Sequence, residues 1–143
     1  MKRIDVSIVI PSRNRCAKLK ITLESVYKQA AENDRCEVIV INNGSTDDTE
    51  KLCEWYRLNY SNFRYYFAEK PGLHVGRNKG FLESKGSIIA YLDDDVILFP
   101  NWLEALLKTF EDEQVMAACG SVCCVVASPW PCGDKSDRPF FPS

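Results

Sequence analysis

Three consecutive aspartates, Asp93, Asp94 and Asp95, are the side chains of this sequence whose type and spacing most clearly suggest chemistry. They follow the apolar run 87–92, which is rich in β-branched and aromatic residues and predicts a short buried strand. Two like charges about 4 Å apart repel by about 4 kcal/mol at an effective dielectric of about 20. A divalent cation such as Mg²⁺ relieves this repulsion, and it needs few protein carboxylates when phosphates supply other oxygens. The aspartates therefore predict either a metal-and-phosphate site or an acidic turn exposed to solvent.

Apolar runs and amphipathic stretches alternate along the chain, which is the pattern of an α/β fold. At the second helix we expect Ser45 to cap the first turn and Asp48 to occupy the capping-box position. The alternation predicts a mainly parallel sheet flanked by helices and joined by right-handed crossovers. We expect strands at 6–10, 37–41, 63–68, 87–92 and 115–120, and helices at 17–29, from 45 onward, at 75–84 and at 101–111.

Polar clusters follow three of the expected strands, at residues 12–15, 42–45 and 93–95. In parallel α/β sheets, ligands bind beyond the carboxyl ends of the strands, near the point where the strand order reverses. We therefore expect the three clusters to converge on one site. The alternative is that they are unrelated polar turns.

Composition and charge limit the class of protein. The chain has 143 residues, of which 45% are hydrophobic and 27% charged, and its net charge is −2. These values predict one globular domain, and the absence of a long basic run argues against nucleic acid as a partner. The charged start 1–5 lacks the apolar core of a signal peptide, and the nearly apolar stretch 115–127 is too short to span a bilayer. We expect a cytoplasmic protein and leave open contact with the inner face of the membrane.

The seven cysteines are odd in number and scattered in spacing, so we do not expect a disulfide framework. Cys119, Cys123, Cys124 and Cys132 lack the paired spacing of zinc ligands, and we interpret them as small buried hydrophobic residues. Prolines become frequent after residue 127. We therefore expect a folded domain at 1–120 and an irregular tail, containing proline and cysteine, at 121–143.

Four segments, 6–15, 40–49, 76–80 and 86–95, resemble the family 2 inverting glycosyltransferases in content, order and spacing. The similarity covers about residues 4–120 and corresponds to the N-terminal part, which binds the nucleotide sugar. The resemblance implies the GT-A fold of nucleotide-diphospho-sugar transferases, a Rossmann-like, mainly parallel sheet flanked by helices, here apparently truncated. It also implies transfer of a sugar from a nucleotide-diphosphate sugar to an acceptor hydroxyl with inversion.

The resemblance assigns roles to residues of the first three segments. Pro11 and Arg13 are expected to line the nucleotide pocket, and Asn43 is expected to contact the base. The family often has an aspartate next to this position, so the identity of the base is left open, with UDP as the default. Arg77 is expected near the base or the diphosphate, and its alternative role is an ion pair on a helix. His74 is interpreted as a loop residue without a catalytic role.

The aspartates correspond to the DxD motif of the family. The resemblance implies that Asp95 binds a divalent metal, Mn²⁺ or Mg²⁺, with help from Asp93, and that Asp93 and Asp94 contact the nucleotide sugar. The metal would neutralise the leaving diphosphate while a carboxylate base takes the proton of the acceptor hydroxyl. We assign no catalytic base, because the surroundings of Asp134 and Asp137 do not resemble that motif of the family.

Two alternatives to an active transferase remain. The first is a noncatalytic module that binds a nucleotide sugar and lacks the acceptor half with its base. The second is a nucleotidyltransferase, which ranks last because residues 11–15 contain no glycine. The acceptor is expected to be a carbohydrate or a lipid-linked molecule of polysaccharide biosynthesis, and neither its identity nor that of the sugar follows from the sequence.

Overall fold

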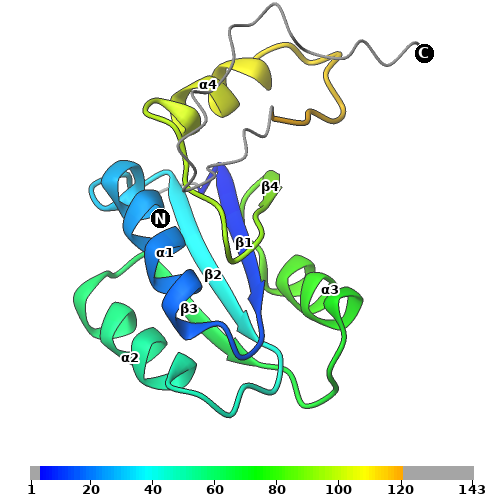
Figure 1. Cartoon of the computed structure of the whole chain (residues 1–143). Helices are drawn as coiled ribbons and strands as arrows, with labels where there is room; N and C mark the ends of the chain where they lie inside the picture. The colour runs from blue at the N-terminus through cyan, green and yellow to red at the C-terminus, as the bar shows by residue number, and fades with distance from the viewer. Residues whose placement is uncertain (1–3, 121–143) are drawn as a thin grey trace, which may run out of the picture.

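The computed structural model describes residues 4–120, and within them four parallel strands form one sheet in the order β3-β2-β1-β4 (Figure 1). The strands are β1 (Val6–Ser12), β2 (Cys36–Asn42), β3 (Phe63–Phe67) and β4 (Ile88–Tyr91). The helices are α1 (Cys16–Ala30), α2 (Thr49–Asn59), α3 (Leu73–Glu83) and α4 (Trp102–Thr109). The predicted parallel α/β sheet is therefore confirmed, while the expected domain boundary and the tail 121–143 lie outside the described residues.

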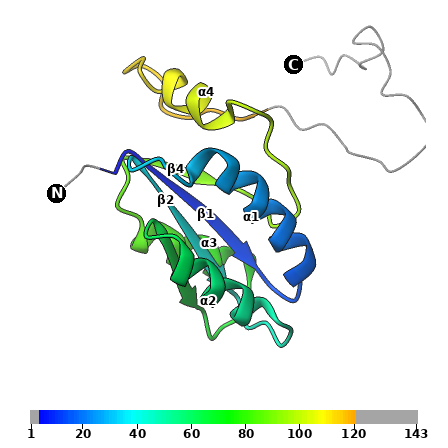
Figure 2. The same cartoon turned by 90° about the vertical axis from the view of Figure 1, so that its left-hand side faces the viewer.

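Helices cover both faces of the sheet, with α1 and α2 on one face and α3 on the other (Figure 1 and Figure 2). Successive residues of a strand point to opposite faces, so each face needs its own apolar set. Ile8 and Val38 belong to the larger core under α1 and α2, whereas Val9 and Ile39 belong to the smaller core under α3. This two-sided burial explains why β1 and β2 are nearly continuous apolar runs.

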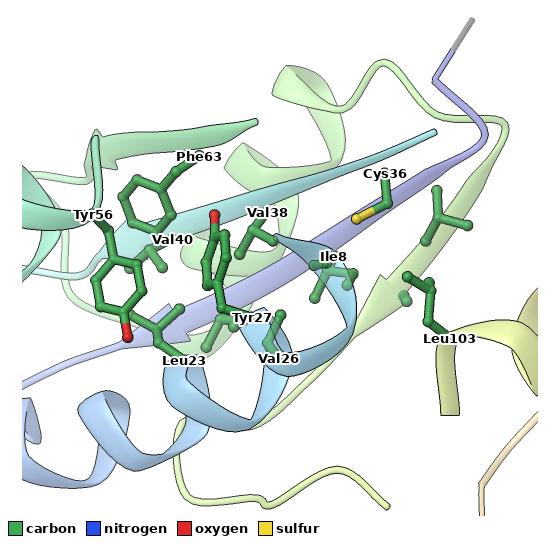
Figure 3. Packing of buried hydrophobic residues seen from close by; sticks show 14 of the residues in the cluster. Ile8, Leu23, Val26, Tyr27, Cys36, Val38, Val40, Tyr56, Phe63 and Leu103 are labelled. Atoms are coloured by element: carbon green, nitrogen blue, oxygen red, sulfur yellow. The ribbon is translucent and has the colours of Figure 1, made fainter. Parts of the chain in front are cut away.

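The larger core is formed mainly by aliphatic strand residues against aromatic and aliphatic side chains of the helices (Figure 3). Tyr27 of α1 packs against Tyr56 of α2 and Phe63 of β3, with ring centroids 5.1 and 6.3 Å away. Cys36 and Cys53 are buried as free thiols. Cys119 is exposed, so the expectation that it is buried is wrong, and Cys123, Cys124 and Cys132 lie outside the described residues.

The first strand continues through Pro11 to Ser12, two residues beyond the predicted end. Pro11 lacks an N–H group and therefore cannot donate to a neighbouring strand. Odd-numbered residues of β1 bond toward β4, since the carbonyl of Val9 accepts from Leu92 N at 3.0 Å. Pairing of β1 with β4 ends at Val9, so no ladder bond is lost at Pro11. This extension brings Ser12 to the carboxyl edge of the sheet.

Residues 115–120 do not form the predicted strand, and most of them are exposed. Val115 N instead donates to Asp112 O at 3.0 Å, which closes a turn after α4. An apolar run becomes a strand only when a neighbouring strand accepts its hydrogen bonds, and within residues 4–120 this run has no such neighbour. No helix in that part of the chain is long and apolar enough to cross a membrane.

Candidate functional site

The candidate site lies at the carboxyl edge of the sheet, where the strand order reverses. Strands β2 and β3 lie on one side of β1, and β4 lies on the other. The strand order therefore reverses beside β1, and α/β sheets bind ligands beyond the carboxyl ends of their strands at such a switch point. The turns that follow β1, β2 and β4 carry the three polar clusters.

The turns after β1 and β2 are tied together by Asn14. This residue has a φ of 52°, in the left-handed region that asparagine tolerates better than most residues. Its backbone N donates to Ser45 Oγ at 3.0 Å, and its Oδ1 accepts from Thr46 N at 2.7 Å. The hydroxyl of Ser45 therefore accepts a hydrogen bond from the turn after β1, and the prediction that Ser45 caps α2 is wrong.

Asp47 ties the same turns a second time and organises the start of α2. Its Oδ2 accepts from Cys16 N at 2.9 Å, and its Oδ1 accepts from Thr49 N at 3.1 Å and from Thr49 Oγ1 at 2.6 Å. Burial alone would raise the pKa of Asp47, but these hydrogen bonds outweigh it and lower the pKa below its ordinary value. Asp48, expected at the capping-box position, precedes α2 and pairs with Lys51 at 2.7 Å.

The three aspartates after β4 do not share one environment. Asp94 is buried, and its Oδ2 accepts from Ser12 Oγ at 2.7 Å. Arg15 Nη1 lies 3.1 Å from Asp94 Oδ1 and 3.0 Å from Asp95 Oδ2. Asp93 is exposed and lies on another side, with its Oδ1 3.7 Å from Arg77 Nη2. The structure thus brings Asp94 and Asp95 together on Arg15 and directs Asp93 toward α3.

Sequence reasoning placed Ser12 and Arg15 in the polar cluster 12–15 without assigning either a role, and it missed Lys18. The hydrogen bond to Asp94 and the charges of Asp94 and Asp95 raise the pKa of Arg15. Lys18 Nζ adds a weaker contact, 3.8 Å from Asp95 Oδ2. The signal that could have found them is their position, because basic residues at the start of the helix after β1 lie at the same sheet edge as the aspartates.

Asn43 has a buried amide with an unpaired acceptor. Its Nδ2 donates to the carbonyl of Gly72 at 2.7 Å, and its Oδ1 has no hydrogen-bond partner among the described residues. A Cβ atom at Gly76 would lie 2.9 Å from Pro11 Cβ and 3.7 Å from Asn43 Nδ2, so α3 approaches the strand ends closely here. An unsatisfied buried acceptor costs about 1–3 kcal/mol, so a ligand N–H that reached it would be favoured.

The remaining predicted residues lie on the exposed side of these turns. Arg13 is exposed in the turn after β1. Arg77 is half-exposed on α3, with its Cζ 6.0 Å from the ring centre of Tyr91. His74 lies in the first turn of α3, which begins at Leu73, so its interpretation as a loop residue is wrong. The helix begins earlier than predicted because Gly72, with a φ of 150°, lets the chain turn directly into it.

A divalent metal fits this edge only if a bound substrate supplies further oxygen atoms to the metal. Within residues 4–120 no three His, Cys, Asp or Glu side chains are arranged to hold an ion. Asp93 and Asp95 are exposed carboxylates on either side of Asp94. Mg²⁺ usually binds one or two carboxylates, several waters and substrate phosphates, and a donor set of this kind meets that requirement.

Comparison with known proteins places the chain in a family. The family model described as Glycosyl transferase family 2 matches residues 7–138. This chain belongs to that family. The resemblance inferred from the four sequence segments is therefore confirmed.

The relatives and solved structures agree on the fold. An uncharacterized glycosyltransferase of Rickettsia bellii is 39% identical over 107 residues, which cover 75% of this chain and 15% of the relative. Residues 1–349 of S. aureus TarS, solved with UDP, superpose with a TM-score of 0.69 at 23% identity, over 76% of this chain and 32% of that one. The Pyrobaculum calidifontis mannosyltransferase PcManGT, solved with GDP-Man and Mn²⁺, gives 0.72 at 21% identity, over 80% and 34%. The GT-A fold is confirmed, and this chain spans between a seventh and a third of these proteins.

Proposed function

We propose that this member of the glycosyltransferase family binds a nucleotide-diphosphate sugar at the carboxyl edge of its sheet and transfers the sugar, with inversion, to an acceptor hydroxyl. The observation that carries the proposal is the pairing, at one edge, of a fixed carboxylate and an unpaired acceptor. Asp94 is held by Ser12 and Arg15, while the Oδ1 atom of Asn43 lacks a partner within residues 4–120. A nucleotide sugar can use both features: a sugar hydroxyl, or a divalent metal that also binds the phosphates, contacts the carboxylate, and a ring N–H of the base donates to Asn43 Oδ1.

The base is recognised by Asn43. Because its Nδ2 donates to Gly72, the Oδ1 acceptor is the part of the amide left for a ligand. Uracil and guanine each present a ring N–H donor, whereas cytosine presents a ring acceptor at the equivalent position. UDP and GDP sugars therefore fit better than CDP sugars, and UDP is the first choice. Related structures support both bases, since TarS is solved with UDP and with UDP-GlcNAc, and PcManGT with GDP-Man.

The diphosphate and sugar are bound by the charged side chains of the edge. Pro11 and Arg13 line the nucleotide pocket, and Arg77 lies beside the diphosphate. Asp93 and Asp94 contact the nucleotide sugar.

Asp95, assisted by Asp93, holds the divalent metal, Mn²⁺ or Mg²⁺. The bound ion supplies positive charge that stabilises the departing diphosphate. Support for a metal comes from the Mn²⁺ complex of PcManGT and from the exposed carboxylate of Asp95.

A noncatalytic module that binds a nucleotide sugar is the second candidate. Inverting transfer needs a base that accepts the proton of the acceptor hydroxyl, a carbohydrate or lipid-linked molecule in this proposal. We assign that role to no carboxylate within residues 4–120. Incubation of the chain with Mn²⁺, a UDP sugar and candidate acceptors separates the two: release of UDP supports the transferase, and binding without release supports the module.

The binding proposal is tested by calorimetric titration of UDP into wild type and Asp95→Ala, each with and without Mn²⁺. We expect Mn²⁺ to strengthen UDP binding in the wild type and to have little effect in Asp95→Ala, because the metal ligand is lost. Asp112→Ala, on an exposed turn after α4, is the matched control and should bind like the wild type. Equal Mn²⁺-dependent affinity in Asp95→Ala would contradict the metal assignment. A thermal-shift panel of UDP, GDP, CDP and dTDP sugars then identifies the base.

A further inference from the structure

Arg15 occupies the place between two carboxylates that a cation would take. The two contacts converge on a single nitrogen, Nη1, which lies 3.1 Å from Asp94 Oδ1 and 3.0 Å from Asp95 Oδ2. Arg15 is the residue immediately before α1, so its backbone is fixed by the first helical turn, whose Leu19 N donates to the Arg15 carbonyl at 2.9 Å. Arg15 therefore offsets part of the negative charge of Asp94 and Asp95.

The two carboxylates held by Arg15 differ in freedom. The side chain of Asp94 is 8% exposed, and its second oxygen is bonded to Ser12. The side chains of Asp95 and Arg15 are 40% and 49% exposed. Removing the partner of a buried charge is strongly unfavourable, whereas an exposed ion pair contributes little. The Arg15–Asp94 contact is therefore the lasting one, and the Arg15–Asp95 contact is the one that can be exchanged.

We propose that Arg15 is the resident counter-cation of the aspartate cluster and a positioning residue for the diphosphate. In the ligand-free protein Arg15 holds Asp95 beside Asp94. When a divalent metal binds, Asp95 leaves Arg15 for the metal, and the guanidinium stays anchored on Asp94. Arginine carries five N–H donors in a planar fork, so a guanidinium anchored through Nη1 retains donors for a phosphate oxygen. This inference rests on the proposed nucleotide-sugar function. It adds that Asp95 exchanges Arg15 for the metal when the metal binds.

The consequence is strong coupling between metal and nucleotide. Metal alone must compete with Arg15 for Asp95, so it binds weakly. A diphosphate supplies oxygens to both the metal and the guanidinium, so each ligand strengthens the binding of the other by the same factor. Lys18 Nζ, 3.8 Å from Asp95 Oδ2, also competes with the metal for Asp95, but more weakly than Arg15.

The test measures Mn²⁺ binding by electron paramagnetic resonance of the free ion, with and without UDP, in wild type and Arg15→Gln. We expect Arg15→Gln to bind Mn²⁺ alone at least about fivefold more tightly than wild type, and the gain that UDP gives to fall by a similar factor. Arg15→Lys keeps the charge and should bind Mn²⁺ alone nearly as weakly as wild type. Unchanged or weaker Mn²⁺ binding in Arg15→Gln would overturn the proposal.

Arg57→Gln is the matched control. Arg57 Nη2 lies 2.7 Å from Glu54 Oε2 on α2, and the two side chains are 55% and 42% exposed, close to the values of Arg15 and Asp95. It should leave Mn²⁺ binding unchanged. If Arg15→Gln does not fold, as judged by circular dichroism, Lys18→Gln tests the same competition and should bind Mn²⁺ about twofold more tightly, an effect within the range of an exposed ion pair. An unchanged affinity there would overturn the proposal.

The outcomes separate this inference from the proposed function. If wild type binds UDP with Mn²⁺ and Arg15→Gln shows the same metal affinity, only the role of Arg15 is overturned. If neither protein binds Mn²⁺ or UDP, both proposals are overturned.

Discussion

The two edges of the sheet each bury a carboxylate beside a serine of β1 and an arginine. Only at the amino edge is the arginine mostly buried as well, and we call that arrangement closed. At the amino edge, Glu37 is 3% exposed and accepts from Ser7 Oγ at 2.6 Å and from Lys85 N at 2.7 Å. Arg64 Nη1 lies 2.9 Å from its second oxygen. Although burial lowers the pKa of Arg64, its hydrogen bond to Glu37 and the charge of Glu37 raise it above the ordinary value. Both carboxylate oxygens are thus paired, and the arginine that pairs with one of them is only 23% exposed.

The carboxyl edge has the same chemical parts in an open arrangement. Asp94 is paired with Ser12 and Arg15, but Arg15 is half-exposed and shared with Asp95. The nearby Asn43 keeps an unpaired acceptor. A closed polar network stabilises one structure, whereas an incomplete one retains binding capacity. The contrast indicates that the amino edge stabilises the fold, and it agrees with the proposal that the carboxyl edge binds a ligand.

The largest effect expected from this contrast is at Glu37. Glu37→Ala removes the closer carboxylate partner of Arg64, whose Nη2 also lies 3.6 Å from Glu83 Oε2. It also removes the acceptor of the Ser7 hydroxyl and one of the two acceptors of Lys85 N. Breaking a buried ion pair from one side costs about 3–5 kcal/mol, so we expect a loss of free energy of unfolding of that size. Urea unfolding followed by circular dichroism measures it.

UDP affinity measured on the folded fraction of Glu37→Ala should equal that of the wild type. A loss of stability below about 1 kcal/mol, within the range of an exposed ion pair, would show that the amino edge is not the closed structural network described here. Exposed Glu54→Ala, on α2, is the matched control and should unfold like the wild type.

Asn43→Ala should show the opposite profile, a small change in stability and a large change in binding. It removes the hydrogen bond to Gly72 but also the unpaired Oδ1, so we expect stability to change by less than about 1 kcal/mol. UDP affinity should fall about tenfold, the value of one lost hydrogen bond of about 1.4 kcal/mol. Calorimetry and urea unfolding on the same samples measure both.

Asn62→Ala is the matched control for Asn43→Ala. Asn62 Nδ2 donates to the carbonyl of Ala30 at 2.8 Å, beside the start of β3 at the amino edge. The control should lose stability and keep UDP affinity. If both variants lost stability and neither lost affinity, Asn43 would be a structural residue and the contrast between the edges would fail.

Much of the fold follows from local sequence, and the fine structure of the site does not. The runs 6–10 and 37–41 are apolar on both faces except at Ser7 and Glu37, so burial on both faces fixes them as central strands. The edge that gathers the polar turns follows from the parallel topology. The run 115–120 was mispredicted because strand formation depends on a neighbouring strand and not on the run itself.

The missed details of the site all depend on partners distant in the sequence. Ser45 looks like a cap locally, but the N–H of Asn14, from the turn after β1, uses its hydroxyl. Asp93 and Asp95 are two residues apart and yet face different cations, Arg77 on α3 and Arg15 before α1. No local pattern shows which of these two aspartates will face Arg15 and which will face Arg77. These choices are made by the packing of the helices against the sheet.

The smallest expected effect concerns Asp47. This residue sharpens the contrast between the edges because it lies at the carboxyl edge but stabilises the fold. Its lowered pKa means that the folded protein favours the charged carboxylate. The stabilisation is therefore fully present above the ordinary pKa of an aspartate and is lost as the pH falls through the lowered value. Asp47→Asn should reduce the free energy of unfolding by about 1 kcal/mol near neutral pH, as the loss of a helix cap does.

The difference between wild type and Asp47→Asn should shrink as the pH falls through the lowered pKa of Asp47, because protonation then removes the same interaction from the wild type. Urea unfolding at a series of pH values measures this convergence. The neighbouring Asp48→Asn breaks only an exposed ion pair with Lys51 and should cost little at any pH. If the Asp47 difference stayed constant with pH, the hydrogen bonds of Asp47 would not depend on its charge, and the link between the turns after β1 and β2 would have to come from Asn14 alone.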